Sequence, residues 1–272
     1  MKRRTLLALP AVLSCSRPEP RPSPRDPLLA IGAELGEIDA ADEAFAVAEL
    51  ARISDRARAA TQPGSEAVAT SVGRLSQLLF EELGFEREVE STALTFVLLP
   101  LVLRNRRGSC VGLGSLYLAL ARSLGLPLSG VLRPGHFHVR TAEAGAPRNF
   151  ELLRRGEVMP EDWYRTKYPA SARASAYGRA LTDGEVRGVV AFNVGNERRR
   201  QNRLEQSRRA YERALELFPE LAEAHASLGA VLHLLGDLAS AERAYANARR
   251  LDPELQGLAH NLDLLERERA AR

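Results

Sequence analysis

A spacing of 34 residues recurs in the last third of the chain and constrains how that third can fold. Three features repeat at this distance: a glycine, a tyrosine with an alanine directly before it and another three residues after it, and a proline (Gly195 and Gly229, Tyr211 and Tyr245, Pro219 and Pro253). A glycine lets two helices pack closely, and a proline cannot continue a helix. A repeat of this length with these residues is typical of stacked helix pairs, each of which buries its apolar face against the next.

This pattern resembles the tetratricopeptide repeat (TPR). We expect two units, residues 188–221 and 222–255, followed by a charged capping helix from Leu255 to about Ala270. Since about three repeats are usually needed for an independently stable array, residues 188–272 are expected to pack against the preceding domain. Such an array either supports that domain or binds a partner peptide in its groove, and both roles remain open.

The N-terminus has the pattern of an export signal. Lys2-Arg3-Arg4 precede a short apolar segment that ends in Val12-Leu13-Ser14-Cys15, which resembles the lipobox of bacterial lipoproteins. We therefore expect residues 1–15 to be a lipoprotein-type signal segment with Cys15 as the lipidated residue. The protein would then be anchored by lipid at the bacterial cell envelope, on the periplasmic or outer-membrane side. Residues 16–27 are rich in proline and are expected to form an extended tether. The alternative is a plain secretory signal in which Cys15 has no role.

Composition excludes several classes of protein. The chain is 45% hydrophobic and 27% charged, which is ordinary for a globular protein, and no apolar run reaches the ~18 residues of a membrane-spanning helix. Without the basic residues of the signal segment, the 38 Lys and Arg fall to the same number as the 35 Asp and Glu. No nucleic-acid partner is therefore expected. Of the 2 cysteines, Cys110 has no intrachain partner if Cys15 carries lipid, and it then stays a thiol.

Residues 28–187 are long enough for one packed core. Their first half has apolar residues at helical spacing, for example in 40–60. Ser109 is a suitable N-cap for a helix whose apolar residues continue to Leu124. Cys110 then lies in the first helical turn, where free backbone N–H groups and the helix dipole stabilise a thiolate. A thiolate is the nucleophile of cysteine acyl-transfer chemistry.

Strand character follows this helix. Residues 128–140 are expected to form two strands separated by Pro134-Gly135. His136 and His138 alternate with apolar residues, so the two imidazoles share one face of the second strand. Residues 149–153 are expected to form the returning strand.

The pairing of these strands decides whether a catalytic triad can form. A register that pairs Arg140 with Pro147 would place His136 opposite Glu151. Cys110, His136 and Glu151 then provide the parts of a Cys–His–acid triad. In such a triad the histidine takes the thiol proton and later protonates the leaving group, while the carboxylate orients the imidazole.

Three segments carry a resemblance to a known family: Leu79-Phe80-Glu81-Glu82-Leu83-Gly84-Phe85, Arg107-Gly108-Ser109-Cys110-Val111-Gly112-Leu113 and Pro134-Gly135-His136-Phe137-His138-Val139-Arg140. Together they resemble the SirB-type bacterial transglutaminase-like family, which often carries TPR repeats behind its core domain. The resemblance implies a papain-like α+β fold with a largely helical N-terminal half and an antiparallel sheet. It also implies that Cys110 is the nucleophile, His136 the base and Glu151 the acid, where the family more commonly has aspartate.

The activity implied by this resemblance is that of a cysteine amidohydrolase or acyltransferase, which acts on amide bonds through a Cys110 thioester without a cofactor. The substrate (a peptide, a peptidoglycan stem or a small amide) stays open, as does the choice between hydrolysis and transfer. The alternative is a non-catalytic adaptor that keeps the fold and buries Cys110 in the core. No metal site is expected, because neither CxxC nor HExxH spacing occurs.

Further residues near the expected site have less defined roles. The backbone N–H of Cys110 is the first candidate for binding an oxyanion, and the side chain of Asn105 is the second. His138 is expected to be structural. The aromatic residues after the expected acid either wall a cleft or pack in the core (Trp163, Tyr164 and Tyr168).

Overall fold

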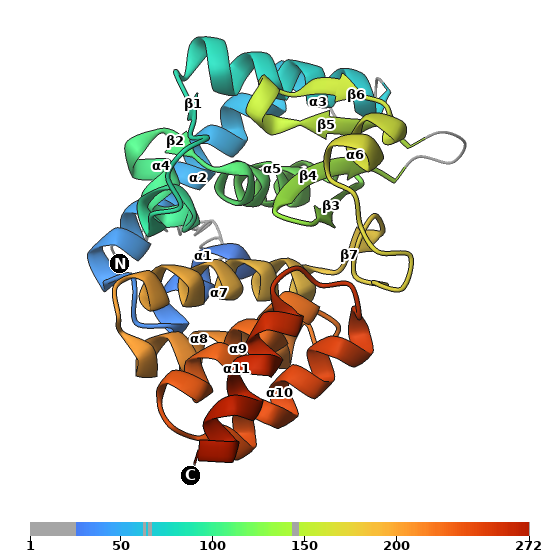
Figure 1. Cartoon of the computed structure of the whole chain (residues 1–272). Coiled ribbons are helices and arrows are strands. Elements are labelled where there is room, and N and C mark those ends of the chain that lie inside the picture. The colour runs from blue at the N-terminus through green and yellow to red at the C-terminus, as the bar shows by residue number, and fades with distance from the viewer. Residues whose placement is uncertain (1–25, 62–63, 65–66, 143–146, 272) are drawn as a thin grey trace, which may run out of the picture.

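The computed structural model describes residues 26–61, 64, 67–142 and 147–271. Figure 1 shows that these residues form two parts, an α+β part with a sheet and a C-terminal part of paired helices. The expected α+β core followed by a helical repeat is therefore confirmed. The expected signal segment with Cys15, and residues 16–25 of the expected tether, lie outside the described residues.

The first half of the α+β part is helical, as its apolar spacing predicts. Apolar side chains such as Ile53, Leu75 and Val102 are fully buried and belong to one core cluster. This burial explains why apolar residues recur at intervals of three and four along these helices. The elements in chain order are α1 (Pro27–Glu34), α2 (Ala40–Thr61), α3 (Val68–Gln77), the π-helical turn η1 (Leu78–Glu82), the 3-10 turn η2 (Leu94–Phe96) and α4 (Leu99–Asn105).

Helix α5 (Cys110–Leu124) lies at the centre of this core, and its ends follow from its sequence. The Ser109 hydroxyl accepts a hydrogen bond from the Gly112 N–H at 3.3 Å, as expected for an N-cap. Gly125 closes the helix with a φ of +69°, a conformation that glycine adopts without strain. Gly112 has no room for a side chain, because a Cβ there would lie 2.1 Å from the Phe96 carbonyl oxygen. This close approach holds η2 against the helical turn that begins with Cys110.

The second half of the α+β part is an antiparallel five-stranded sheet with the strand order β6-β5-β4-β3-β7. Phe137 on β4 packs between this sheet and α5, because Gly114 of α5 and Gly130 of β3 leave room for its ring; a Cβ at either glycine would lie 2.4 Å from the ring. A short parallel pair, β1 with β2, precedes α5. The strands are β1 (Glu86–Arg87), β2 (Arg107–Gly108), β3 (Leu128–Arg133), β4 (His136–Thr141), β5 (Asn149–Glu151), β6 (Glu157–Met159) and β7 (Ala180–Leu181).

The register between β4 and β5 differs from the one that we expected. Arg140 pairs with Asn149, and the pairing with Pro147 was wrong. The pairing continues by one more pair, since the Thr141 N–H donates to the Arg148 carbonyl at 3.0 Å. The Arg148 N–H in turn donates to the Thr141 hydroxyl at 3.0 Å. Hydrogen bonds at the end of the strands therefore set the register, and the turn-forming composition of the segment did not reveal them.

This error has a limited effect on the site because the register differs by two residues. Side chains alternate between faces with a period of two, so a shift of two keeps every side chain on its expected face. His136 and Glu151 therefore still share one face of the sheet, although they lie diagonally across from each other and not directly opposite.

The C-terminal part consists of two helix pairs and a capping helix. Gly195 packs against the ring of Tyr211 and Gly229 against the ring of Tyr245, where a Cβ would lie 2.5 and 2.6 Å from ring atoms. The two contacts are equivalent in the repeat and explain the spacing of the glycines and tyrosines. The helices are α7 (Asp183–Arg200), α8 (Leu204–Leu217), α9 (Ala222–Leu234), α10 (Leu238–Leu251) and α11 (Leu258–Ala271). Helix α7 runs without a break through the domain boundary that we expected after residue 187.

The first helix pair packs on the α+β part, as a short array requires. Val190 and Val194 of α7 belong to the same buried cluster as Leu28 of α1. At the rim of this contact, Glu34 of α1 forms ion pairs with Arg187 of α7 and with Arg213 of α8. The two parts therefore share one apolar core.

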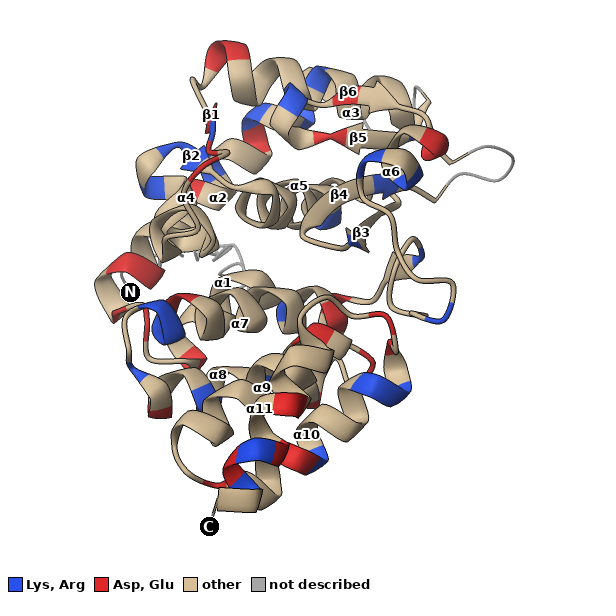
Figure 2. Ribbon diagram, viewed as in Figure 1, with Lys and Arg blue, Asp and Glu red and all other residues tan. Residues whose placement is uncertain are grey.

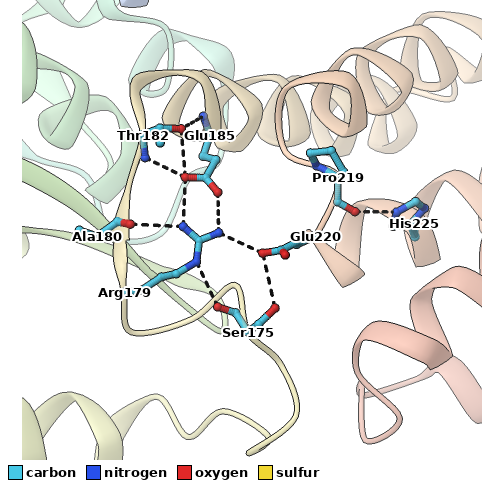
Figure 3. Close-up of polar contacts among 8 residues, drawn as sticks. All are labelled: Ser175, Arg179, Ala180, Thr182, Glu185, Pro219, Glu220 and His225. Carbon is cyan, nitrogen blue, oxygen red and sulfur yellow. Dashed lines mark hydrogen bonds and ion pairs between the residues drawn. The ribbon is translucent and has the colours of Figure 1, made fainter.

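Arg179, which directly precedes β7, connects the α+β part to the helical repeat (Figure 3). Its guanidinium donates hydrogen bonds to Glu185 of α7 at 3.0 Å and to Glu220, between α8 and α9, at 3.2 Å. The Ser175 hydroxyl also donates to Glu220, at 3.5 Å. Thr182 and Glu185 form a capping box that begins α7. These contacts hold residues 175–182 in place between the two parts.

Among the residues described, no helix has both the length and the apolar character that crossing a bilayer requires. Figure 2 shows Lys and Arg segments interspersed with Asp and Glu segments over both parts of the molecule.

Candidate active site

Cys110 is the first residue of α5, and its side chain is half-buried with a free thiol. The preceding Ser109 donates two hydrogen bonds to the carbonyl oxygen of Phe96. One comes from its hydroxyl at 3.0 Å and the other from its backbone N–H at 2.8 Å. The N–H groups of the first turn have no partner within a helix. The backbone N–H of Cys110 is therefore oriented at a helix N-terminus beside its own sulfur.

His136 at the start of β4 lies between Cys110 and Glu151. Its Nε2 atom is 2.7 Å from Oε2 of Glu151, and both side chains are buried, with exposed fractions of 4% and 1%. The other oxygen of Glu151 accepts a hydrogen bond from the Leu153 N–H at 3.0 Å. Since Nε2 faces the carboxylate, Nδ1 is the ring nitrogen left to interact with Cys110, which raises the pKa of His136. The structure therefore brings together all three residues that the sequence singled out.

The surroundings of His136 favour its charged form. Burial lowers the pKa of His136, but hydrogen bonds with Cys110 and Glu151, together with the negative charges of these residues, raise it to about 9. A histidine with this pKa carries its proton at neutral pH. The charged imidazole of His136 therefore lies between the Glu151 carboxylate and the Cys110 side chain.

Aromatic side chains of α6 (Glu161–Lys167) and the residue after it cover the histidine face of the sheet. The ring of Tyr168 stacks on His136 with 4.2 Å between centroids and 5° between planes. Tyr164 is fully buried and stacks on His138 at 3.8 Å. Trp163 meets Tyr164 edge-on at 4.9 Å. Tyr164 is therefore a core residue, while the half-buried Tyr168 is the aromatic residue in contact with the candidate base.

His138 is fully buried, and a polar network that the sequence did not reveal surrounds it. Its Nε2 atom lies 3.2 Å from Oδ1 of Asn149. The same oxygen accepts a hydrogen bond from Nε of Arg140 at 2.6 Å, and Arg140 also binds Glu161 at 2.6 Å. Only the pairing of β4 with β5 and the packing of α6 bring these residues together. The sequence signal was weak, since arginine, asparagine and glutamate are common surface residues.

Burial keeps His138 neutral, which makes the stability of the protein sensitive to acid. Burial lowers the pKa of His138 to about 2, and the positive charges of Arg140 and His136 lower it as well. The unfolded chain binds a proton at this side chain near pH 6.5 and the folded chain does not, so stability falls as the pH falls below 6.5.

We expect the protein to lose about 2 kcal/mol of unfolding free energy between pH 7 and pH 5 through His138 alone. Urea denaturation of the wild type and of His138→Gln at both pH values measures this loss, because glutamine cannot take up the proton. The matched control is His260→Gln, which alters an exposed histidine of α11 and should lose as much stability as the wild type. An equal loss in His138→Gln and the wild type would contradict this account.

Asn105, the second candidate for binding an oxyanion, already uses one of the two donors of its side-chain amide. Its side-chain amide donates to the Leu101 carbonyl of its own helix at 2.8 Å, and the residue is exposed. The backbone N–H of Cys110 remains the first candidate for this role. Within the described part of the chain, no group of three or more His, Cys, Asp or Glu side chains is arranged to hold a metal ion.

Comparisons with known proteins agree with this architecture. Residues 195–236 match the family model of the TPR repeat. Two curated proteins match over 85 residues, the protein O-mannosyl-transferase TMTC1 of mouse at 35% identity and that of human at 34%. Each match covers 31% of this chain but only 9% and 10% of those proteins, so the chain spans about a tenth of their length. The family model of the transglutaminase-like superfamily matches residues 44–181, which include Cys110, His136 and Glu151. The chain therefore belongs to the transglutaminase-like superfamily.

Proposed function

We propose that this protein is a cysteine amidohydrolase or acyltransferase that cleaves amide bonds through a thioester on Cys110. The observation that carries the proposal is the position of His136, whose pKa is raised by its interaction with Cys110 and whose Nε2 atom lies 2.7 Å from Glu151. Membership of the transglutaminase-like superfamily and the free, only partly buried Cys110 support it. The rival hypothesis, a non-catalytic adaptor, requires a buried and unreactive cysteine.

The first half of the proposed reaction forms the thioester. The Cys110 thiolate attacks the carbonyl carbon of the amide, and the electron pair of the C=O bond moves to the oxygen. The N–H of Cys110 stabilises this oxyanion. The imidazolium of His136 then gives its Nδ1 proton to the amide nitrogen, so the C–N bond breaks and an amine leaves. Glu151 holds the ring in the orientation that this transfer requires.

The second half of the reaction regenerates the enzyme. Water or a second amine gives a proton to Nδ1 of His136 and attacks the thioester carbonyl. The C–S bond breaks and the thiolate leaves, so the product is a carboxylic acid after hydrolysis or a new amide after transfer. The imidazolium and the thiolate are both restored.

We also propose that the enzyme acts at the bacterial cell envelope, anchored by a lipid on Cys15. This proposal rests on the order of basic residues, apolar segment, Cys15 and proline-rich residues in the sequence. A partner of the TPR repeat is part of the same proposal, since the repeat supports binding of another protein or peptide.

Labelling with an alkyne-bearing iodoacetamide tests the enzyme proposal before any substrate is known. We expect the label to map to Cys110 in the folded full chain, and we expect Cys110→Ala to abolish both this labelling and any amide turnover found in a substrate screen. Cys15→Ser is the matched control, because it removes the other cysteine and should leave turnover unchanged. Undiminished turnover in Cys110→Ala would dismiss the assignment.

A further inference from the structure

A cavity of about 610 Å³ lies between the α+β part and the helical repeat. One wall comes from the turn Pro134-Gly135 and from residues 169–171 and 177 of the α+β part. The other wall comes from the beginning of α9 and from the segment between α10 and α11, with residues 223, 252 and 254–256. Both parts of the protein are therefore needed to form this cavity.

The repeat contributes only negative charge to the cavity. Its wall carries three carboxylates (Glu223, Asp252 and Glu254), and the described lining contains no lysine or arginine. In Glu223, Oε1 accepts a hydrogen bond from the Tyr177 hydroxyl, but Oε2 is fully buried and has no hydrogen-bond partner. A buried carboxylate oxygen without a donor is costly, and a ligand that supplies one removes this cost.

Burial and a neighbouring carboxylate both oppose the ionisation of Glu223. Burial raises the pKa of Glu223 and the negative charge of Asp252 adds to this effect, whereas hydrogen bonds from the Tyr177 hydroxyl and from the backbone N–H of Glu223 lower it. A positive charge in the cavity would stabilise the ionised carboxylates. The three carboxylates are not arranged to hold a metal ion, as noted for the described part of the chain, so the cation that fits is an organic ammonium group with its own N–H donors.

The acidic wall is held in a fixed position relative to the candidate catalytic residues. Tyr177 binds Glu223 directly, and the contacts of Arg179 in Figure 3 hold the same segment against the turn between α8 and α9. Two residues of the opposite wall are sequence neighbours of the candidate site. Gly135 precedes His136, and Pro169 follows the Tyr168 ring that stacks on His136.

We propose that this acidic cavity binds a primary ammonium group of the amide substrate or of the acyl acceptor, next to the Cys110 and His136 site. The inference rests on the proposed function and adds the class of substrate: a molecule that carries a primary amine besides the reacting group, such as a diamine or a peptide with a free amino group. The repeat then has a role in substrate recognition, because it supplies the carboxylates.

Matched thiol reagents test this inference without a known substrate. The reagents are pairs of chloroacetamides with the same alkyl tail. In one member of each pair the tail ends in a primary ammonium group, and in the other it ends in an acetylated amine. Pairs with several tail lengths are compared. The rate constant for modification of Cys110 is measured in the full chain carrying Cys15→Ser. At the best tail length, we expect the cationic reagent to react on the order of tenfold faster than its neutral counterpart.

Variants of two of the three carboxylates test whether the cavity causes the faster reaction of Cys110 with the cationic reagent. Glu223→Gln and the exposed Glu254→Gln should each reduce the ratio of the two rate constants, and the double variant should bring this ratio to one. Because Glu254 is exposed, its variant keeps the test valid if Glu223→Gln does not fold. Glu216→Gln on α8 also removes one negative charge, but outside the cavity, and should keep the preference.

The outcomes for the two proposals are distinguishable. Equal rates for both reagents in the wild type, or a preference that persists in the double variant, would overturn the ammonium site. A neutral reagent that modifies Cys110 only at the rate of an ordinary thiol would instead count against the catalytic proposal. The two failures also differ in a turnover assay with an amine acceptor. If only the ammonium site is wrong, turnover is still observed; if the catalytic proposal is wrong, no turnover is observed.

Discussion

His136→Asn is expected to lower the turnover of an amide substrate by on the order of 10³-fold or more, because it removes both the base and the acid of the proposed reaction. Asparagine still donates a hydrogen bond from its side chain, so the fold around Glu151 should survive. His138→Gln is the matched control, since it alters the neighbouring histidine on the same strand and face and should retain turnover at neutral pH.

The pH profile separates a catalytic role of His136 from a structural one. The pKa of His136 is raised to about 9, so the imidazolium is present through neutral pH and is lost as the pH rises through about 9. We therefore expect turnover to fall above about pH 9, because the leaving amine then has no acid to protonate it. We also expect Cys110 to react readily with iodoacetamide below pH 7 in the wild type.

In His136→Asn the same alkylation should become appreciable only toward pH ~8.5, as for an ordinary thiol. Rates are measured from pH 5 to 10, with the modified cysteine identified by mass spectrometry. Superimposable pH profiles for His136→Asn and the wild type would show that the histidine does not activate the thiol.

Phe137→Ala is expected to lower the unfolding free energy by about 3–5 kcal/mol. The ring is fully buried and fills the space that Gly114 and Gly130 leave between α5 and the sheet. Alanine would leave a cavity there, which the surrounding backbone cannot close because both glycines lie in regular elements. The measurement is chemical denaturation at pH 7, followed by circular dichroism.

The same substitution should also affect the site, because Phe137 joins the helix that carries Cys110 to the strand that carries His136. We expect slower labelling of Cys110 under conditions in which the variant is folded. Phe45→Ala is the matched control: Phe45 is 37% exposed and packs under Arg104, so its loss should cost less than about 1 kcal/mol. A Phe137→Ala protein as stable as this control would contradict the packing described here.

The presence of glutamate as the third residue of the site has a structural explanation. The observed register places Glu151 diagonally across from His136, and diagonal neighbours on adjacent antiparallel strands are further apart than directly opposed ones. The additional methylene group of glutamate increases its reach across this diagonal. The other oxygen of this carboxylate accepts a hydrogen bond from the Leu153 N–H, so both oxygens of Glu151 have a partner.

Local features of this protein could be predicted from the sequence because they depend on neighbouring residues. The cap at Ser109 and the glycine at the end of α5 place Cys110 at a helix N-terminus, and strand alternation puts His136 and His138 on one face. The spacing of glycines and tyrosines indicates the helix pairs. Each of these patterns follows from backbone geometry with a period of a few residues, or from one repeated unit.

Other features were decided only by the tertiary structure. Hydrogen bonds near the β4–β5 turn set the strand register, and the packing of α6 placed Tyr168 on His136. The apolar contact of α7 with α1 brought the carboxylates of the repeat to the cavity next to the turn Pro134-Gly135. These contacts join residues far apart in the chain, and their formation depends on which buried surfaces and hydrogen bonds fit together in three dimensions. Local propensity therefore predicted the catalytic candidates, whereas long-range packing determined how they are oriented and which charges surround them.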